Sequence, residues 1–329
     1  MTPIRRLLCC ALLACACGGA LAQGPSTGSG QAYPNRPIRI LVGFTPGGTT
    51  DVVARIVAQK MSEGLGNSVV IDNRPGAGAN IAAELAAKSP PDGYTALAVN
   101  PGLAISVTAY ARLGYNALRD LAPVARVADS SHLLIVHPSL PVRSVKDLIA
   151  LARTRPGQLN FSSAGVGNAD HFAGELFKAL ARIDMVHVPY KGGAQAAQDT
   201  ITGQVSMYFS GILVGLPLAK AGRVRALAVA TGTRSPLAPD IPTIAESGLP
   251  GYEMALWNAV FVPAATPRGI IGRLNAEILK ALKSPDVRER LAGVGAVPSG
   301  GSPEELGTYF RSEVEKFGKI VQATGLKIE

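Results

Sequence analysis

The feature that most constrains the fold is an alternation of short apolar runs with longer amphipathic runs. PIRILVGF, SVVIDN and YTALAV have the length of buried strands and are bounded by Gly, Pro and Asn. Between them, DVVARIVAQKMSEGLG and ANIAAELAAKS carry apolar residues at helical spacing. The strand-like series continues with SSHLLIVHP, QLNFSSAG, MVHVPY, QVSMYFSG and VRALAVA. This alternation predicts an α/β fold in which helices cover both faces of parallel sheets.

Two helix starts are marked by caps. Ser144 is followed three residues later by Asp147, and Ser302 is followed by Pro303 and two glutamates. A serine that accepts a hydrogen bond from the third helical N–H is a common helix start, and proline is favoured at the first helical position. We therefore predict that helices begin directly after Ser144 and Ser302.

The first 22 residues have the pattern of a secretory signal peptide. MTPIRR is basic, LLCCALLACAC is apolar, and Ala20-Leu21-Ala22 fits a small-residue cleavage site. This apolar run is too short for a convincing membrane span, and no later run is long and apolar enough for one. We predict a periplasmic protein cleaved after Ala22, with lipid attachment at Cys15 as the alternative. Residues 23–33 are Gly/Ser-rich and are predicted to form a flexible leader.

Cysteine usage, charge and length exclude several classes of protein. All four cysteines lie inside the predicted signal peptide, so the cleaved chain has no disulfide and no thiol nucleophile. The formal net charge of +9 favours solubility and attraction of anionic ligands. Basic residues are scattered rather than interleaved with aromatic ones, which argues against nucleic acid as a partner. Cleavage would leave about 300 residues, more than one core comfortably holds, so two domains are expected.

The sequence lacks the patterns of common enzymes and metal sites. Its four histidines show neither HExxH nor i, i+4 spacing, no GxSxG elbow joins a predicted strand to a predicted helix, and the P-loop is absent. His187 alternates with valines and is predicted to be a satisfied strand residue, and Trp257 to pack in the core or at a hinge. Asp51 has two interpretations, a helix-start cap or a catalytic carboxylate. We predict a binding protein with no cofactor and no metal site rather than an enzyme.

Three loops that contain glycine lead from a predicted strand to a predicted helix, at residues 45–51, 162–171 and 190–193. Glycine permits positive φ and close approach of the backbone to a ligand. Free N–H groups at a helix start favour an anion, and such loops gather at the carboxyl ends of parallel strands. The loops therefore predict an anion site, with ordinary capped turns as the alternative. A fourth loop, residues 73–80, is predicted to shape the edge of a domain.

Longer blocks of sequence follow one another in a recognisable order. They are YPNRPIRILVGFTPGGTTDVVARIVAQKM, VVIDNRPGAGANIAA, SPPDGYTALAV, LNFSSAGVGNADHFAGELF, HVPYKGGAQAAQDTITGQV and WNAVFVPAATP. Together they resemble the tripartite tricarboxylate transporter receptors, the Bug family of extracytoplasmic solute-binding proteins. The resemblance runs from Tyr33 to the C-terminus, and its specificity comes from the order and spacing of the blocks.

The resemblance implies a type II periplasmic-binding-protein fold, in which crossing strands join two doubly wound α/β lobes around a ligand cleft. Lobe 1 is expected to be discontinuous, at residues 34–127 plus 254–329, and lobe 2 is expected at residues 128–253. The crossings are expected near residues 125–128 and 252–255. The implied function of this monomer is to capture a small carboxylate, a dicarboxylate or an aromatic acid, for large and small membrane permease subunits. A sensor that feeds a two-component kinase is the alternative, followed by an exported enzyme.

The resemblance also implies that backbone amides, rather than an arginine fork, grip the carboxylate. The expected lobe 1 residues are Phe44, Thr45, Gly47, Gly48, Thr49, Thr50 and Asp51. The expected lobe 2 residues are Ser163, Ala164, Gly165, Asn168, His171, Gly192, Gly193 and Ser210. A side chain at Gly48 is expected to occupy the anion's space and to conflict with the φ of the turn. Ser206 and Ser210 stand where relatives often have acids, which favours a ligand without an ammonium group.

Overall fold

The structure is a computed structural model that describes residues 33–325, 327 and 328; the predicted signal peptide and residues 23–32 of the predicted leader lie outside them. The strands are β1 (Ile38–Val42), β2 (Val69–Asn73), β3 (Thr95–Val99), β4 (Leu121–Val136), β5 (Asn160–Ser163), β6 (Val186–Pro189), β7 (Met207–Gly211), β8 (Arg225–Val229), β9 (Ala255–Pro263) and β10 (Ala296–Pro298). The helices are α1 (Thr49–Leu65), α2 (Asn80–Ala87), α3 (Gly102–Ala109), α4 (Ala117–Asp120), α5 (Val145–Thr154), α6 (Ala169–Ala181), α7 (Gly193–Thr202), α8 (Ile212–Lys220), α9 (Arg268–Lys283), α10 (Pro285–Gly293) and α11 (Pro303–Thr324), with a 3-10 helix at Ala77–Ala79.

The strands form a mixed sheet with the order β2-β1-β3-β9-β4-β7-β5-β6. At one end β1 pairs in parallel with β2 and β3, and at the other end β5 pairs in parallel with β6 and β7. The central pairs β3–β9, β9–β4 and β4–β7 are antiparallel, as are the pairs of β8 and β10 with β4. The predicted parallel arrangement therefore holds within each end, whereas the connecting strands between them are antiparallel.

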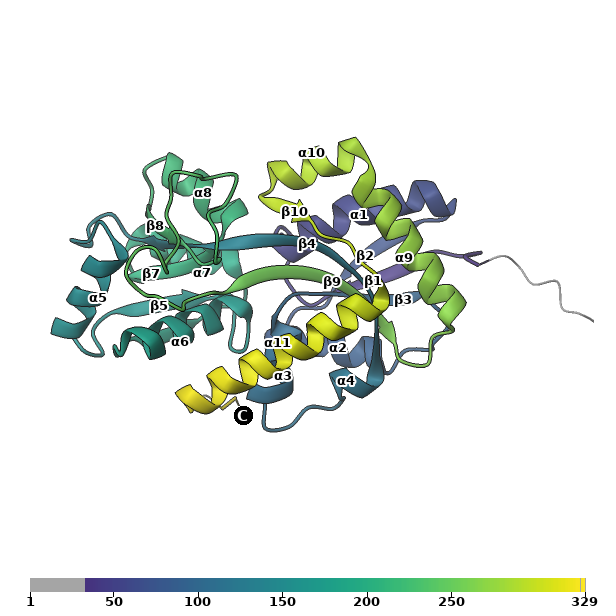
Figure 1. Ribbon diagram of the computed structural model, residues 1–329, viewed down its shortest axis with the longest axis horizontal. Helices are drawn as coiled ribbons and strands as arrows, with labels where there is room; N and C mark the ends of the chain where they lie inside the picture. The colour runs from purple at the N-terminus through teal and green to yellow at the C-terminus, as the bar shows by residue number, and fades with distance from the viewer. Residues whose placement is uncertain (1–32, 326, 329) are drawn as a thin grey trace, which may run out of the picture. The chain divides into compact units, whose positions relative to one another are not determined.

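Strand β4 belongs to both ends of the sheet. Residues Leu121–Ser131 pair with β9, whereas His132–Val136 pair with β7 and residues 133–136 also with β8. Register shifts occur along the β4–β9 ladder, and such irregularities bend a strand locally. Figure 1 shows β4 and β9 as the long strands that run between two groups of elements, which form the two lobes. The predicted lobe limits at 127/128 and 253/254 stay a prediction.

Each lobe buries apolar side chains on both faces of its strands. In β1, Ile40 and Val42 pack in one cluster with Val53 and Ile56 of α1, whereas Leu41 packs in a different cluster with residues of α2 and α3. This alternation is the period of two that a strand imposes on its side chains. Helices therefore cover both faces, as the sequence predicts.

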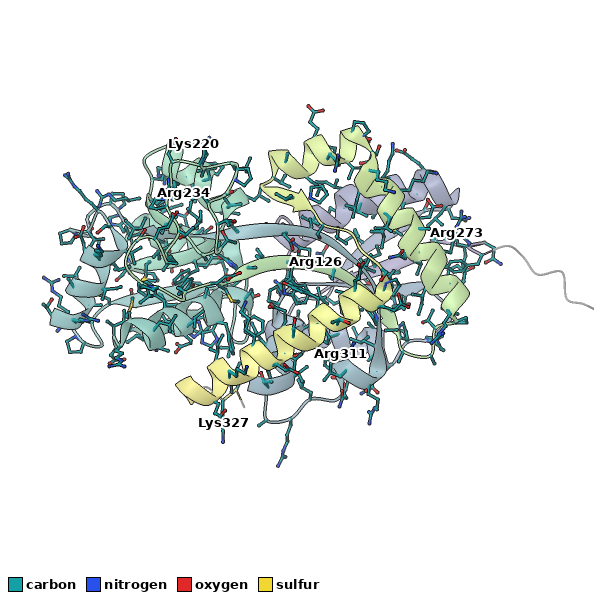
Figure 2. All side chains as sticks on the ribbon, viewed as in Figure 1. Arg126, Lys220, Arg234, Arg273, Arg311 and Lys327 are labelled. Atoms are coloured by element: carbon teal, nitrogen blue, oxygen red, sulfur yellow. The ribbon has the colours of Figure 1, made fainter. Side chains whose placement is uncertain are left out.

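Helix α11 braces the crossing strands. Trp257 of β9 is fully buried, and its indole N–H donates to Glu313 Oε2 of α11 at 2.9 Å. Arg126 of β4, labelled in Figure 2, lies over the ring of Tyr309 at 4.0 Å and pairs with Asp129 at 2.6 Å. The predicted packing role of Trp257 is confirmed.

Both predicted caps are present. The hydroxyl of Ser144 accepts from the N–H of Asp147, and Ser302 forms a reciprocal capping box with Glu305. Within the described residues, no helix combines the length and the apolar character that a membrane crossing requires.

Candidate ligand-binding cleft

A cavity of about 750 Å³ is lined by residues of both lobes, a volume typical of small-molecule sites. It brings together the three predicted loops, which are far apart in the sequence. The predicted residues that line it are Phe44, Thr45, Gly48, Thr49, Thr50, Ala164, Gly165, Asn168, Gly192 and Gly193. Helices α1, α6 and α7 begin at these loops, so the N–H groups of three helix starts lie at one cavity.

Five other predicted residues are not among those that line the cavity: Gly47, Asp51, Ser163, His171 and Ser210. Asp51, Ser163 and His171 form hydrogen bonds with residues in or next to the glycine loops. The hydroxyl of Ser210 donates to the carbonyl of Gly211 at 3.2 Å, and Ser206 is hydrogen-bonded to Asn160. Because neither serine lines the cavity, the lack of charge at these two positions does not disfavour an ammonium group in the ligand.

Asp51 is a buried brace of the first loop. Its Oδ2 accepts from the N–H of Gly47 at 2.9 Å, and its Oδ1 accepts from Asn73 Nδ2 at 2.8 Å. Arg55 Nε lies 3.0 Å from both carboxylate oxygens. Burial opposes ionisation, but the hydrogen bonds from Arg55, Gly47 and Asn73 outweigh it and lower the pKa of Asp51 below its usual value. The structure therefore favours the helix-start interpretation of Asp51 over a catalytic one.

The two glycines of the first loop have different conformations. Gly47 has a φ of 84°, in the region that favours glycine, whereas Gly48 has an extended conformation with a φ of −73°. A Cβ added to Gly48 would meet only the carbonyl oxygen of Thr45, at an ordinary 3.6 Å. The expectation that the φ of Gly48 forbids a side chain is therefore wrong, and the residue with the restricted backbone is Gly47.

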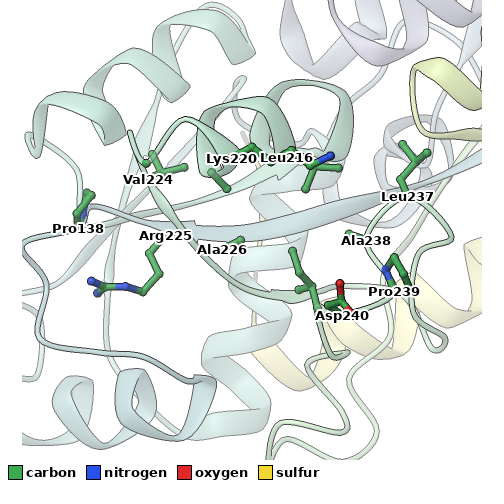
Figure 3. Close-up of a pocket in the computed structure, with 13 residues that line it drawn as sticks. Pro138, Leu216, Lys220, Val224, Arg225, Ala226, Leu237, Ala238, Pro239 and Asp240 are labelled. Carbon is green, nitrogen blue, oxygen red and sulfur yellow. The ribbon is translucent and has the colours of Figure 1, made fainter.

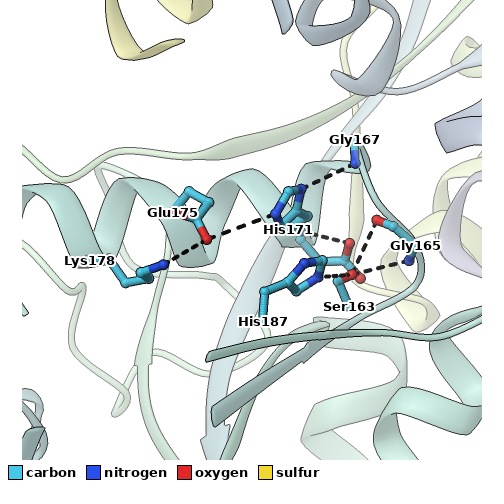
Figure 4. A network of polar contacts seen from close by, with 8 residues as sticks. Ser163, Gly165, Gly167, His171, Glu175, Lys178 and His187 are labelled. Carbon is cyan, nitrogen blue, oxygen red and sulfur yellow. Dashed lines mark hydrogen bonds and ion pairs between the residues drawn. The ribbon is translucent and has the colours of Figure 1, made fainter. Parts of the chain in front are cut away.

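Two stacked histidines support the loop that precedes α6 (Figure 4). Ser163 Oγ lies 2.6 Å from His187 Nε2, and the rings of His187 and His171 stack with their centroids 3.8 Å apart. His171 Nδ1 accepts from the N–H of Gly167 at 3.2 Å. Burial lowers the pKa of His171 to about 3 and that of His187 to about 4, so both rings are neutral near pH 7. His187 is a satisfied strand residue, as predicted, and His171 fixes the loop.

Asp170 is an acidic group of the cavity that sequence reasoning missed. Its Oδ2 accepts from the N–H of Ala164 at 2.8 Å and from the hydroxyl of Tyr208 at 3.0 Å. Burial raises the pKa of Asp170 to about 6, although these hydrogen bonds oppose the rise. The available sequence signal was an acid in the first turn of a helix that begins after Asn168, and this pattern usually indicates only a cap.

Among the residues that the structure describes, the charged side chains that line the cavity are Asp170, Lys191 and Lys327. Two cations and one weakly acidic carboxyl give a positive balance, which the three helix starts reinforce. The other lining residues, which were not among the predicted site residues, are Gly43, Pro75, Gly76, Ala77, Gly78, Ala79, Asn100, Tyr110, His132, Val166, Tyr190, Tyr208, Gly211, Val214, Leu256 and Ile328. The fourth loop thus forms part of the cavity wall.

The two lobes touch around the cavity. The hydroxyl of Tyr110 donates to the carbonyl of Val166 at 3.2 Å, and Asn100 Nδ2 lies 3.4 Å from Asn168 Oδ1. At the C-terminus, Ile328 exchanges backbone hydrogen bonds with residues 109 and 111, which places Lys327 and Ile328 in the cavity wall. These contacts describe a closed arrangement of the lobes.

A second hollow, of about 570 Å³, lies beside α8 and β8 (Figure 3). Its Arg225 is already engaged, because one guanidinium nitrogen donates to the carbonyls of Leu140 and Val142. None of the three glycine loops reaches this hollow. Within the described part of the chain, no cluster of three or more His, Cys, Asp or Glu residues could hold a metal ion.

Comparison with known proteins is consistent with this geometry. Residues 53–326 match the model of the tripartite tricarboxylate transporter family receptor. The UPF0065 protein in the tcbD-tcbE intergenic region of Pseudomonas sp. (strain P51) is 42% identical over 92% of each chain. A solved R. palustris protein with adipate is 40% identical and covers 90% of this chain and 99% of its own, with a TM-score of 0.86. MatC from Rhodopseudomonas palustris, with bound malate, is 31% identical, with a TM-score of 0.83 over 88% of this chain and 100% of its own. The expected two-lobed binding-protein fold is confirmed.

Proposed function

Because this chain belongs to the tripartite tricarboxylate transporter receptor family, whose members are solute-binding receptors rather than enzymes, we propose that it captures a small carboxylate between its lobes. The observation that carries the proposal is the meeting of three helix starts at one cavity that residues of both lobes line. Unpaired N–H groups and the helix dipole stabilise an anion at such a position. A carboxylate is the expected anion because two similar solved proteins are named with adipate and with malate.

The charges of the cavity favour a ligand with two carboxylates and no ammonium group. Lys191 and Lys327 suit a second negative charge, whereas Asp170, the one acid among the described lining residues, is already engaged by Ala164 and Tyr208. A ligand ammonium group would need an acceptor that is free to receive it. We therefore place aliphatic dicarboxylates first and aromatic acids second.

The receptor is proposed to act in the periplasm and to deliver its ligand to the large and small membrane subunits of a tripartite tricarboxylate permease. The basic, apolar and small-residue segments at the N-terminus support export. The family description supports delivery to a transporter. Lobe closure around the ligand would present a distinct surface to the permease.

A thermal-shift screen followed by titration calorimetry tests the proposal. A ligand that binds only the folded state raises the melting temperature by mass action. We expect shifts with succinate, glutarate or adipate, and smaller shifts or none with aspartate, glutamate and sugars. A chain that responds to none of the carboxylates, or that responds more strongly to a sugar, would refute the proposed ligand class.

A further inference from the structure

His132 lies in the wall of the cavity and is only 4% exposed. It belongs to β4 and is paired directly with Gly211 of β7 in an antiparallel ladder. Directly paired residues on antiparallel strands project from the same face of the sheet, with their Cβ positions about 5 Å apart. A Cβ added to Gly211 would lie 2.6 Å from Thr49 Oγ1. The side chain of His132 therefore projects from the face of the sheet on which Thr49, the first residue of α1, lies.

A second helix also begins at this point of the cavity. Helix α8 starts directly after Gly211, and both Gly211 and Val214, the third residue of α8, line the cavity. The N-cap residues of α1 and α8 are glycines, Gly48 and Gly211, and neither helix has a hydrogen bond from its first turn to a capping side chain. The N–H groups of both first turns therefore remain donors for a ligand or for water. His132 lies beside these two uncapped helix starts.

The imidazole of His132 is itself incompletely hydrogen-bonded, because its Nδ1 atom is buried without any partner. Burial lowers the pKa of His132 to about 4, so the ring is neutral near pH 7 and carries one N–H. A buried donor without a partner is rarer in proteins than an unsatisfied acceptor, so the proton is expected on Nε2. Since Nδ1 is sealed from solvent, the edge that carries Nε2 is the part of the ring that a ligand in the cavity can reach.

We propose that His132 is a ligand-contacting residue whose Nε2–H donates to the same carboxylate that the start of α1 holds. The inference rests on the proposed function, and it adds a side-chain donor from a crossing strand to the backbone amides of the helix starts. A carboxylate offers about four lone-pair sites, so one group accepts from first-turn N–H groups and from the imidazole together. Thr49 belongs to one lobe and Gly211, the partner of His132, to the other. A carboxylate bound by both sides therefore stabilises the contact between the lobes.

Titration calorimetry with the tightest of succinate, glutarate and adipate tests the proposal. His132→Leu should weaken binding about tenfold or more, because a hydrogen bond to a charged group is lost. His132→Gln, whose amide can donate from a similar position, should retain most of the affinity. Combining His132→Leu with Thr49→Ala should cost less than the product of the two single losses, because both groups act on one carboxylate. His137→Leu, at a histidine that does not line the cavity, should leave the affinity unchanged.

The stability of His132→Leu without ligand separates a ligand contact from a structural role. Removing a buried polar atom that has no partner should leave the free energy of unfolding unchanged or higher. A marked destabilisation would instead assign His132 a structural role. Nitrogen NMR of the wild-type imidazoles gives a readout that does not depend on the folding of a variant. His132 should show the Nε2–H tautomer, and its signals should change when the carboxylate is added.

The outcomes distinguish this inference from the proposed function. An unchanged affinity in His132→Leu, losses that multiply fully in the double variant, or an Nδ1–H tautomer would overturn the inference while carboxylate capture stands. If the wild type binds no carboxylate at all, the proposed function itself fails and the inference falls with it.

Discussion

Thr49 at the start of α1 lies against Gly211 at the end of β7: a Cβ added to Gly211 would be only 2.6 Å from Thr49 Oγ1. The two residues belong to different lobes. At this contact between the lobes, a glycine leaves room for a threonine hydroxyl. Gly192 lies against Thr45 in a similar way, because a Cβ added to Gly192 would be 2.7 Å from Thr45 Oγ1.

Gly211→Ala should hinder lobe closure without hindering folding, since Gly211 has an ordinary φ of −54°. We expect ligand affinity to fall about tenfold, because the clash affects only the closed form and reduces its population. Combining Gly211→Ala with Thr49→Ala should remove the clash, because the Cβ of Thr49 lies 3.9 Å from the added Cβ. Calorimetry of the single and double variants measures the coupling. Simple additivity of the two losses would show that the lobes do not meet here in the bound state.

The first loop gives a matched pair of glycine substitutions. Gly47→Ala should destabilise the fold by about 1 kcal/mol, because Gly47 has positive φ. Gly48→Ala should leave stability nearly unchanged, because its φ is ordinary and the nearest atom to the added Cβ is 3.6 Å away. Gly48 lines the cavity, so Gly48→Ala should weaken ligand binding instead. Urea unfolding and calorimetry separate the two effects, and the reverse pattern would contradict this account of the loop.

Asp51→Asn should destabilise the protein at neutral pH by about 1–3 kcal/mol, since an amide cannot accept from Gly47, Asn73 and Arg55 together. The folded pKa of Asp51 is lowered, so its stabilising contribution is present above the unfolded value of about 3.9 and is lost as pH falls through the folded value. The difference in unfolding free energy between wild type and variant should therefore shrink in acid. A difference that stays constant down to low pH would show that the charge of Asp51 is not responsible.

Asp170 predicts a pH dependence of ligand binding. Its pKa is raised to about 6, so the carboxyl goes from about half ionised at pH 6 to almost fully ionised at pH 8, and the ionised form repels a ligand carboxylate in the same cavity. Diacid affinity should be several-fold higher at about pH 6 than at about pH 8, and Asp170→Asn should remove most of that difference. Calorimetry at both pH values tests this prediction. If Asp170→Asn keeps the same pH dependence of affinity, another group causes that dependence.

The same shift affects stability with the opposite sign to that of Asp51. Because the folded pKa of Asp170 lies above the unfolded value, its contribution is full below about pH 4 and is lost as pH rises through about 6. The free energy of unfolding of Asp170→Asn should therefore not show this loss as pH rises. If the difference in unfolding free energy between wild type and variant stays constant across this pH range, the pKa of Asp170 is not raised.

The loops could be predicted because their signals are local. Glycines after a strand and hydroxyl residues before a helix lie together in the sequence, and ten predicted residues line the cavity. Asn100, Tyr110 and Ile328 could not be found in this way, because tertiary packing alone brings them to the cavity. His132 gave no signal either, since a histidine within an apolar run is usually an ordinary strand residue.

Strand length and sheet direction were harder to predict than strand existence. Strand β4 begins at Leu121, but the run SSHLLIVHP predicted only its second half. Pro123, Arg126 and Asp129 interrupt the apolar pattern of the first half, and the pairing with β9 stabilises that half despite them. The strand is specified there by its partner, which a local pattern does not reveal.

The C-terminal residues have a practical consequence for biosensing. Lys327 lies in the wall of the cavity, held there by the backbone hydrogen bonds of Ile328 to the first lobe. All four cysteines of the sequence lie in the predicted signal peptide, so Lys327→Cys would introduce a single thiol into the cleaved chain. A solvent-sensitive dye on that thiol would convert ligand capture directly into a fluorescence signal.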